Sequence, residues 1–340
     1  MNSTMTTPQP GSALTLSIVV PLFNEQAVLL EFHQRLTLAL ASVGDDVEIV
    51  YVDDGSSDCS PKLLQQLRAS DPRVSMLRFS RNFGKEAALA AGLEAAVGAS
   101  VIMMDADLQH PPEFIPAMLQ AWRGGADVVS MRRRSRDTET WVKRTAARLF
   151  YRVLNALSDI PIPEDVGDFR LLSRRAVEAL NLLHERNRFM KGLFAWIGFN
   201  QVTLDYDCAE RAAGHSKWRF RQLWHFAVEG ITAFSIVPLR LASLVGLSSA
   251  LLAFAYAAWF VFKTLVLGEA VRGFPTLIVA VLMIGGLQLL AIGVLGEYLG
   301  RLSLEAKRRP LYLIQDYAPA TVLGTPKPRT HRHSLFGRQA

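Results

Sequence analysis

Two carboxylates that could bind a metal ion or a substrate follow directly after an apolar run. Asp105 and Asp107 follow residues 99–104, which are apolar apart from one serine. Mg²⁺ prefers carboxylate oxygens, and a protein that binds it through one or two carboxylates usually holds substrate phosphates on the same ion. In open α/β sheets, ligands bind at the carboxyl ends of strands, where this pair should lie. The pair therefore suggests a metal–diphosphate site, and a solvated loop or a helix cap is the equally weighted alternative.

A second acidic segment ends another apolar run. Residues 52–58 read VDDGSSD, so that Asp53 and Asp54 come where a strand should finish. Such carboxylates can accept hydrogen bonds from a nucleobase or ribose, and the following glycine permits a tight turn. Alone, this segment is also an ordinary turn and helix cap. It becomes more specific together with residues 20–25 (VPLFNE), which contain Pro21 and Glu25.

The elements that must position these acids follow an alternating pattern from residue 16 to residue 133. Apolar runs of strand length predict strands at residues 16–21, 47–52, 74–79, 100–104 and 127–131. Longer helical patterns predict helices at residues 26–42, 60–69, 85–97 and 112–122. This alternation is typical of parallel βαβ units in a doubly wound α/β sheet. The glycine-rich motifs of dinucleotide-binding and P-loop proteins do not occur.

Two long apolar runs distinguish the C-terminal part of the chain. Of the 340 residues, 50% are hydrophobic and 20% are charged, and residues 241–262 and 274–296 contain no charge. A membrane-spanning helix needs about 20 apolar residues, so each run is long enough; two buried helices of a soluble protein are the alternative. Lysine and arginine are concentrated before the first run and after the second. That bias predicts a multi-pass inner-membrane protein whose catalytic domain and termini are cytoplasmic.

The remaining segments complete the expected domain organisation. Residues 1–13 should be a disordered leader, and residues 14–236 the catalytic domain. Within that domain, basic amphipathic patterns predict interfacial helices at about 138–157 and 217–234, a docked surface helix being the alternative for the first. Membrane helices are expected at about 239–262 and 274–296, a juxtamembrane segment at 301–315, and a disordered basic tail at 316–340. The net charge of +6 then indicates anionic lipid and phosphates rather than nucleic acid.

Taken together, the motifs resemble those of a known enzyme family. Residues 20–25, 52–58, 81–86 (RNFGKE) and 105–109 (DADLQ) occur in the order found in family-two glycosyltransferases with the GT-A fold. Residues 167–170 (GDFR), residues 211–217 (RAAGHSK) and the apolar hairpin make the chain similar to the polyprenyl-phosphate glycosyltransferases. These include bactoprenol glucosyltransferases, dolichol-phosphate mannose synthases and lipid-A aminoarabinose carrier transferases. The resemblance extends over roughly residues 16–313.

The resemblance implies a role for each matching residue. Asp168 is implied as a base or positioning acid and Asp107 as catalytic. Nucleotide-sugar binding is implied for Pro21, Glu25, Asp53, Asp54, Lys85, Asp105 and Arg211. Mg²⁺ or Mn²⁺ would be held by Asp105, Asp107 and Gln109. The lipid phosphate would be held by Arg133, Arg144, Arg148, Ser216 and Lys217. For Lys85, a surface position without a role in binding is an equally weighted alternative. For each of the basic residues taken singly, a solvated or lipid-facing position is also an alternative.

The implied reaction is an inverting transfer of one sugar from a UDP-sugar to a polyprenyl phosphate such as undecaprenyl phosphate. Glucose is the first expectation, while an amino sugar, an aminoarabinose derivative or mannose from GDP remains open. A phosphate monoester has its second pKa near 6, so the acceptor is already anionic and needs little help from a base. An acid near that anion would repel it, so cationic neighbours are expected around Asp168.

Three further expectations complete the sequence-based picture. A processive polysaccharide synthase and a non-catalytic lipid-binding scaffold are the alternative functions. The Gln-x-x-Arg-Trp motif of processive polysaccharide synthases does not occur in this sequence, and the intact acids argue against a non-catalytic scaffold. Cys59 and Cys208 have no metal-like spacing, which agrees with a reducing, cytoplasmic compartment. A homo-oligomer is plausible because similar proteins assemble through their membrane hairpins.

Overall fold

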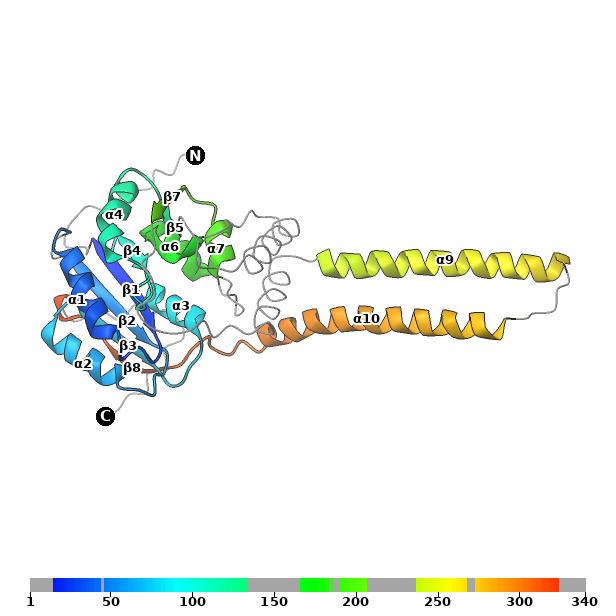
Figure 1. Cartoon of the computed structure of the whole chain (residues 1–340), viewed down its shortest axis with the longest axis horizontal. Coiled ribbons are helices and arrows are strands. Elements are labelled where there is room, and N and C mark those ends of the chain that lie inside the picture. Colours follow the sequence, from blue (N-terminus) through cyan, green and yellow to red (C-terminus); the bar gives the residue numbers. More distant parts are fainter. Residues whose placement is uncertain are drawn as a thin grey trace, which may run out of the picture.

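An eight-stranded sheet forms the centre of the α/β part of the protein (Figure 1). The structure is a computed structural model that describes residues 15–43, 46–133, 166–183, 185, 190–206, 237–267 and 273–323. In this part of the chain the strand order is β7-β5-β6-β4-β1-β2-β3-β8. The strands are β1 (Leu16–Leu22), β2 (Val47–Asp53), β3 (Val74–Phe79), β4 (Ser100–Met103), β5 (Val128–Arg133), β6 (Val166–Ser173), β7 (Gln201–Tyr206) and β8 (Ile314–Ala318).

The direction of the strands confirms the predicted mostly parallel α/β sheet. Strand β1 pairs in parallel with β2 and β4, and β2 pairs in parallel with β3. Strands β6 and β8 run the other way: β6 lies between β4 and β5, and β8 lies beside β3. The five strands predicted from the sequence are present within two residues of their expected bounds, whereas β6, β7 and β8 were not predicted. Strand β6 matters most because it brings residues 167–170 next to β4.

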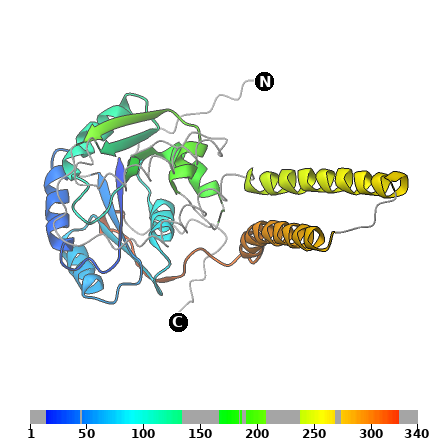
Figure 2. The same ribbon diagram turned by 45° about the vertical axis from the view of Figure 1, so that its right-hand side comes forward.

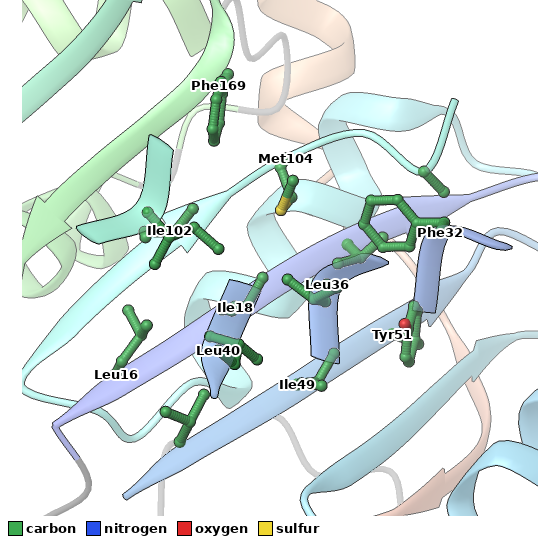
Figure 3. Packing of buried hydrophobic residues seen from close by; sticks show 14 of the residues in the cluster. Leu16, Ile18, Phe32, Leu36, Leu40, Ile49, Tyr51, Ile102, Met104 and Phe169 are labelled. Atoms are coloured by element: carbon green, nitrogen blue, oxygen red, sulfur yellow. The ribbon is translucent and has the colours of Figure 1, made fainter. Parts of the chain in front are cut away.

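Helices cover both faces of the sheet. One hydrophobic cluster includes residues of α1 (Leu29–Leu40), α2 (Ser60–Ser70) and α4 (Ile115–Arg123), the last preceded by the 3₁₀ turn η1 (Pro112–Phe114). The other cluster includes residues of α3 (Lys85–Ala95), α6 (Arg174–Leu182) and α7 (Met190–Trp196). Figure 3 shows how Phe32, Leu36 and Leu40, which recur at helical spacing, pack from α1 onto Ile18 and Ile49 of the strands.

Helix α3 packs unusually close to the sheet. Its residues 87–93 are all buried, and most of them are alanine. A Cβ atom added at Gly92 would lie 2.2 Å from Cγ1 of Val19, so a larger residue there would separate helix and strand. This close packing fixes the axis of α3 and therefore the place of Lys85, its first residue, near the carboxyl ends of the parallel strands.

Two long helices extend away from the sheet side by side (Figures 1 and 2). Helix α9 (Val237–Leu267) has 31 residues and α10 (Phe274–Ala306) has 33, so each is about 46–50 Å long at 1.5 Å per residue. Large apolar side chains such as Phe254 and Leu265 are 76% and 80% exposed. Of the described helices, the segment Met283–Ala306 is long and apolar enough to cross a membrane, while Ala242–Tyr256 is a shorter apolar stretch. Exposed apolar surface of this extent marks an interaction surface.

The chain returns from α10 to the sheet through residues 307–323, which we call the C-terminal strap. Strand β8 pairs with β3, and the strap ends in the 3₁₀ turn η2 (Thr321–Leu323). Tyr312 stacks on Phe79 at 4.9 Å, and its hydroxyl donates a hydrogen bond to Glu94 over 2.5 Å. The prediction of a disordered tail from residue 316 is therefore wrong for residues 316–323. Composition missed this segment because pairing with the edge of β3 and packing on Phe79, which are contacts distant in sequence, order it.

Other expectations concern residues that the structure does not describe. The predicted leader at 1–13, the two interfacial helices and the tail beyond residue 323 lie outside the described residues. The juxtamembrane segment predicted at 301–315 is divided, since α10 continues to Ala306 and the strap follows.

Candidate functional site

The acids at the end of β2 are buried and held by internal contacts. Asp53 is fully buried; its Oδ1 accepts a hydrogen bond from the Ser56 amide at 2.9 Å, and its Oδ2 lies 3.2 Å from Nε of Arg78. The two oxygens of Asp54 accept from the amides of Phe83 at 2.7 Å and Gly84 at 2.9 Å. Burial raises the pKa of Asp54, and these backbone hydrogen bonds partly oppose the rise. Asp54 thus fixes the loop that leads into α3.

The loop after β1 lies against the same turn. Pro21 is buried within β1, opposite Val52 of β2. The Glu25 amide donates to Oγ of Ser60 at 3.0 Å, and Oδ1 of Asn24 accepts from the Ser57 amide at 2.9 Å. The segments that the sequence predicts as nucleotide-binding therefore form one connected unit, although they are far apart in the chain.

The acids after β4 lie in a tight turn that leaves them partly exposed. The Asp105 amide donates to Nδ1 of His110 at 2.9 Å, and the Gln109 amide donates to Oδ1 of Asp107 at 3.1 Å. Leu108 has a φ of 63°, an uncommon value for a non-glycine residue that is characteristic of functional turns. His110, for which the sequence predicts a loop role, thus positions Asp105 through its backbone. Its ring stacks on Phe169 of β6 at 5.1 Å.

One lysine joins this turn to Asp168. Nζ of Lys85 lies 2.7 Å from Oδ1 and 2.8 Å from Oδ2 of Asp105, and 2.6 Å from Oδ2 of Asp168. Burial alone lowers the pKa of Lys85, but the charges and hydrogen bonds of the two carboxylates outweigh it. The pKa of Lys85 is therefore well above the usual range for lysine. The structure thus supplies Asp168 with the cationic neighbour that its proposed role requires.

The residues present fit a divalent metal whose coordination a substrate completes. Among the described residues, no three His, Cys, Asp or Glu side chains are grouped closely enough to hold an ion by themselves. Asp105, Asp107 and Gln109 nevertheless offer hard oxygen atoms from one short turn. Mg²⁺ is commonly bound by one or two carboxylates together with substrate phosphates, so this limited donor set suits a metal–diphosphate complex.

The remaining predicted residues are described in part or not at all. Arg133 ends β5 and only its backbone is described. The other predicted phosphate ligands lie outside the described residues: Arg144, Arg148, Arg211, Ser216 and Lys217. Their roles stay predictions.

Sequence reasoning missed two arginines that support the site, one partly exposed and one buried. Arg78 of β3 forms the ion pair with Asp53. Arg170 of β6 is 1% exposed, lies over the ring of Phe194 at 4.5 Å, and donates from Nε to the carbonyl of Gly167 at 3.0 Å. It thereby fixes the backbone on both sides of Asp168. The sequence did contain a signal for these residues, a charged side chain within an apolar strand. It did not show which other residues that side chain would contact.

Comparison with known proteins identifies the family. The family model for glycosyl transferase family 2 matches residues 17–180, and that for the GtrB C-terminal hairpin matches residues 237–302. A bactoprenol glucosyl transferase of Shigella phage SfV is 46% identical over 303 residues, which cover 89% of this chain and 99% of that protein. The chain belongs to glycosyltransferase family 2. The uncharacterized glycosyltransferase sll0501 of Synechocystis is also 46% identical, over 89% of this chain and 95% of its own length.

This glycosyltransferase also resembles solved structures at low identity. A mannosyltransferase from Pyrobaculum calidifontis, in complex with GDP-Man and Mn²⁺, is 19% identical with a TM-score of 0.43, covering 93% of this chain and 80% of that chain. The predicted family, the GT-A fold and the assignment of the chain as a glycosyltransferase enzyme are confirmed.

Proposed function

We propose that this glycosyltransferase transfers one sugar, glucose from UDP-glucose in the first instance, to undecaprenyl phosphate or a related polyprenyl phosphate. The observation that carries the proposal is the meeting of Asp105 and Asp168 at one edge of the sheet, beside the loops predicted to bind the nucleotide. Relatives at 46–47% identity that are named bactoprenol glucosyl transferases support the choice of glucose and of the lipid.

On the donor side, Glu25 and Asp53 would hold the ribose and uracil, and Asp54 would keep the loop before α3 in place. The acidic turn would hold Mg²⁺ or Mn²⁺ through Asp105, Asp107 and Gln109. When bound, the metal would supply Lewis-acid stabilisation of the leaving diphosphate.

On the acceptor side, a phosphate oxygen of the lipid would attack C1 of the sugar as the bond to the nucleotide diphosphate breaks, which inverts the configuration. Because this phosphate is already anionic at neutral pH, Asp168 would orient the acceptor rather than remove a proton. Lys85 offsets the negative charge of Asp168 so that the anion can approach. The basic residues Arg133, Arg144, Arg148 and Lys217, with Ser216, would bind the lipid phosphate, arginine in a bidentate manner, and Arg211 would bind the nucleotide sugar.

We further propose that both helices of the hairpin cross the inner membrane. Each is longer than the roughly 30 Å hydrocarbon core, and their exposed apolar side chains support contact with lipid. The lysines and arginines that flank the hairpin favour a cytoplasmic position for the catalytic domain and both termini. The acceptor phosphate, which lies at the membrane surface, would then be within reach of the site. Assembly into a homo-oligomer through the hairpins stays a prediction.

The decisive experiment is a transfer assay with purified full-length protein in detergent, undecaprenyl phosphate and Mn²⁺. UDP-glucose, UDP-N-acetylglucosamine, a UDP-aminoarabinose derivative and GDP-mannose are supplied separately, and lipid-linked product is identified by mass spectrometry. We expect product with UDP-glucose. Product with another donor alone would correct the sugar, and product with none, under conditions where a bactoprenol glucosyl transferase is active, would exclude the proposed function.

Two variants test whether the product comes from the assigned site. Asp107→Asn should abolish transfer because the acidic turn loses a metal ligand. Cys59→Ala is the matched control: Cys59 is exposed, and its hydrogen bonds with Gln26 and Leu63 are made by its backbone, which the substitution keeps. Equal activity in the two variants would mean that the metal site is misassigned.

A further inference from the structure

The ammonium group of Lys85 occupies the position from which a cation would bind Asp105. Its three contacts go to both oxygens of Asp105 and to one oxygen of Asp168, at 2.6–2.8 Å. Two of these contacts are hydrogen bonds, one to Asp105 and one to Asp168, and the third is a close ion-pair contact with Oδ1 of Asp105. In this arrangement most of the donor capacity of Lys85 is directed at the two carboxylates rather than at a diphosphate or an acceptor phosphate.

The place of Lys85 is determined by its surroundings. It is the first residue of α3, whose axis is fixed by close packing against the sheet at Gly92. The preceding residues are held by Asp54 through the amides of Phe83 and Gly84. The segments that carry the two carboxylates are held close together, because β4 and β6 pair up to Met103 and Arg170. The side chain of Lys85 is 42% exposed and has room to move.

A divalent ion on Asp105 and the present contacts of Lys85 exclude each other. Mg²⁺ binds carboxylate oxygens at about 2.0–2.1 Å, closer than the ammonium group of Lys85, and would place two cations within a few ångströms. The repulsion is relieved when the ion arrives with a nucleotide diphosphate, whose negative oxygens give the ammonium group new partners.

We infer that Lys85 is a positioning residue that keeps Asp105 and Asp168 in place without metal and makes the metal and the nucleotide diphosphate bind together. This inference rests on the proposed function only in assigning the metal to Asp105. On entry of the complex, Lys85 leaves Asp105, stays on Asp168, and turns its freed donors toward phosphate oxygens. Divalent ions alone should therefore bind the protein weakly.

The test is a titration of the full-length protein in detergent with Mn²⁺ alone and with Mn²⁺ plus UDP, in which free Mn²⁺ is measured by electron paramagnetic resonance. Without UDP, Lys85→Met should bind Mn²⁺ about tenfold more tightly than the wild type, because a competing charge is gone. UDP should tighten Mn²⁺ binding strongly in the wild type and much less in the variant. Lys85→Gln should change Mn²⁺ affinity in the same direction, and it replaces Lys85→Met in the titration if Lys85→Met does not fold.

Two controls make the result specific. Lys62→Met removes one exposed lysine from α2 and should leave Mn²⁺ affinity unchanged, which excludes an effect of net charge. Adding Asp107→Asn to Lys85→Met should abolish the gain, which places the ion at the acidic turn. The inference is overturned if Lys85→Met binds Mn²⁺ no more tightly than the wild type without UDP, or if neither protein binds Mn²⁺ with UDP present. Because neither sugar nor lipid is used, failure here is distinct from failure of the transfer assay.

Discussion

Two neighbouring regions of the sheet end in paired acids, yet the surroundings of these acids differ. At the end of β2, Asp53 and Asp54 are 0% and 3% exposed and bind the backbone and Arg78. After β4, the side chain of Asp105 is 24% exposed, and the nearest partner of its oxygens is the end of a flexible lysine side chain, with Nδ1 of His110 farther away at 3.9 Å. Asp54 is part of the framework, and Asp105 can exchange its partner for a ligand.

This difference separates two ways in which acidic strand ends serve a glycosyltransferase. A buried carboxylate that accepts backbone hydrogen bonds stabilises a loop, and its loss leaves amides unsatisfied. A carboxylate whose partner is a flexible ammonium group can be made available without unfolding anything. Mutations of Asp54 and of Asp105 should therefore affect different quantities, stability for Asp54 and activity for Asp105.

The largest effect is expected for Asp105→Asn. Removing one charged metal ligand should lower the rate of sugar transfer by about a hundredfold or more, a size typical for loss of one electrostatic group at the reacting centre. The melting temperature should stay close to that of the wild type because Asp105 is partly exposed. Transfer assays and thermal unfolding followed by circular dichroism measure the two quantities. A large drop in melting temperature would place Asp105 in the framework and remove the contrast.

Gly55→Ala should disturb the framework next most strongly. Gly55 has a φ of 70°, and an added Cβ would lie 2.5 Å from the carbonyl carbon of Arg81 in the loop before α3. The backbone conformation should cost about 1–2 kcal/mol, and the overlap a further 1–3 kcal/mol or so. Gly125→Ala is the matched control, since its φ is 99° and nothing lies within 4 Å of the added atom. Equal losses of stability in the two variants would mean that the loop before α3 shifts to accommodate the added Cβ without an energetic cost.

Asp54→Asn tests the same framework through hydrogen bonding. The amide nitrogen of asparagine cannot accept, so either the Phe83 or the Gly84 amide loses its partner, at a cost of about 1–3 kcal/mol. For a domain of this size the melting temperature should fall by roughly 2–4 °C per kcal/mol. Asp105→Asn, the identical chemical change at the other strand end, is the control. An unchanged melting temperature in Asp54→Asn would contradict the assignment of Asp54 to the framework.

The smallest effect concerns a polar cluster between α1, β2 and the residues before β3. His33 contacts the Tyr51 hydroxyl at 3.0 Å, and its Nε2 lies 3.6 Å from Oδ2 of Asp71. Burial lowers the pKa of His33, and Asp71 opposes this only in part. The unfolded chain therefore binds a proton more readily, and the free energy of unfolding should fall as the pH drops below about 6.5.

His33→Gln removes this dependence on pH. The difference in melting temperature between wild type and variant should shrink from pH 7.5 to pH 5.5, because only the wild type loses stability through His33. A difference that grows on acidification would show that His33 is charged in the folded protein. In either case transfer activity at pH 7.5 should be nearly unchanged, since His33 contacts Tyr51 and Asp71 rather than the proposed metal ligands.

Local patterns predicted much of the fold and the chemical character of the site. Residues 74–79 form a strand with the predicted bounds because an apolar run of that length is readily recognised. Strand β8 was not predicted in this way, since residues 314–318 (IQDYA) are interrupted by two polar residues and depend on pairing with β3. Likewise, nothing near Lys85 in the sequence reveals that its ammonium group meets Asp168, because that contact requires β6 to lie beside β4.

The sequence by itself determined which residues stand at strand ends, that the chain resembles a lipid-phosphate glycosyltransferase, and that a long apolar hairpin follows the catalytic part. These properties depend on residue types over short windows, where periodicity and composition are sufficient. Only the tertiary structure decided that Asp54 is buried while Asp105 stays accessible, and that Lys85 joins Asp105 to Asp168. Burial and ion pairing depend on segments far apart in the chain, and those segments meet only when the whole sheet forms.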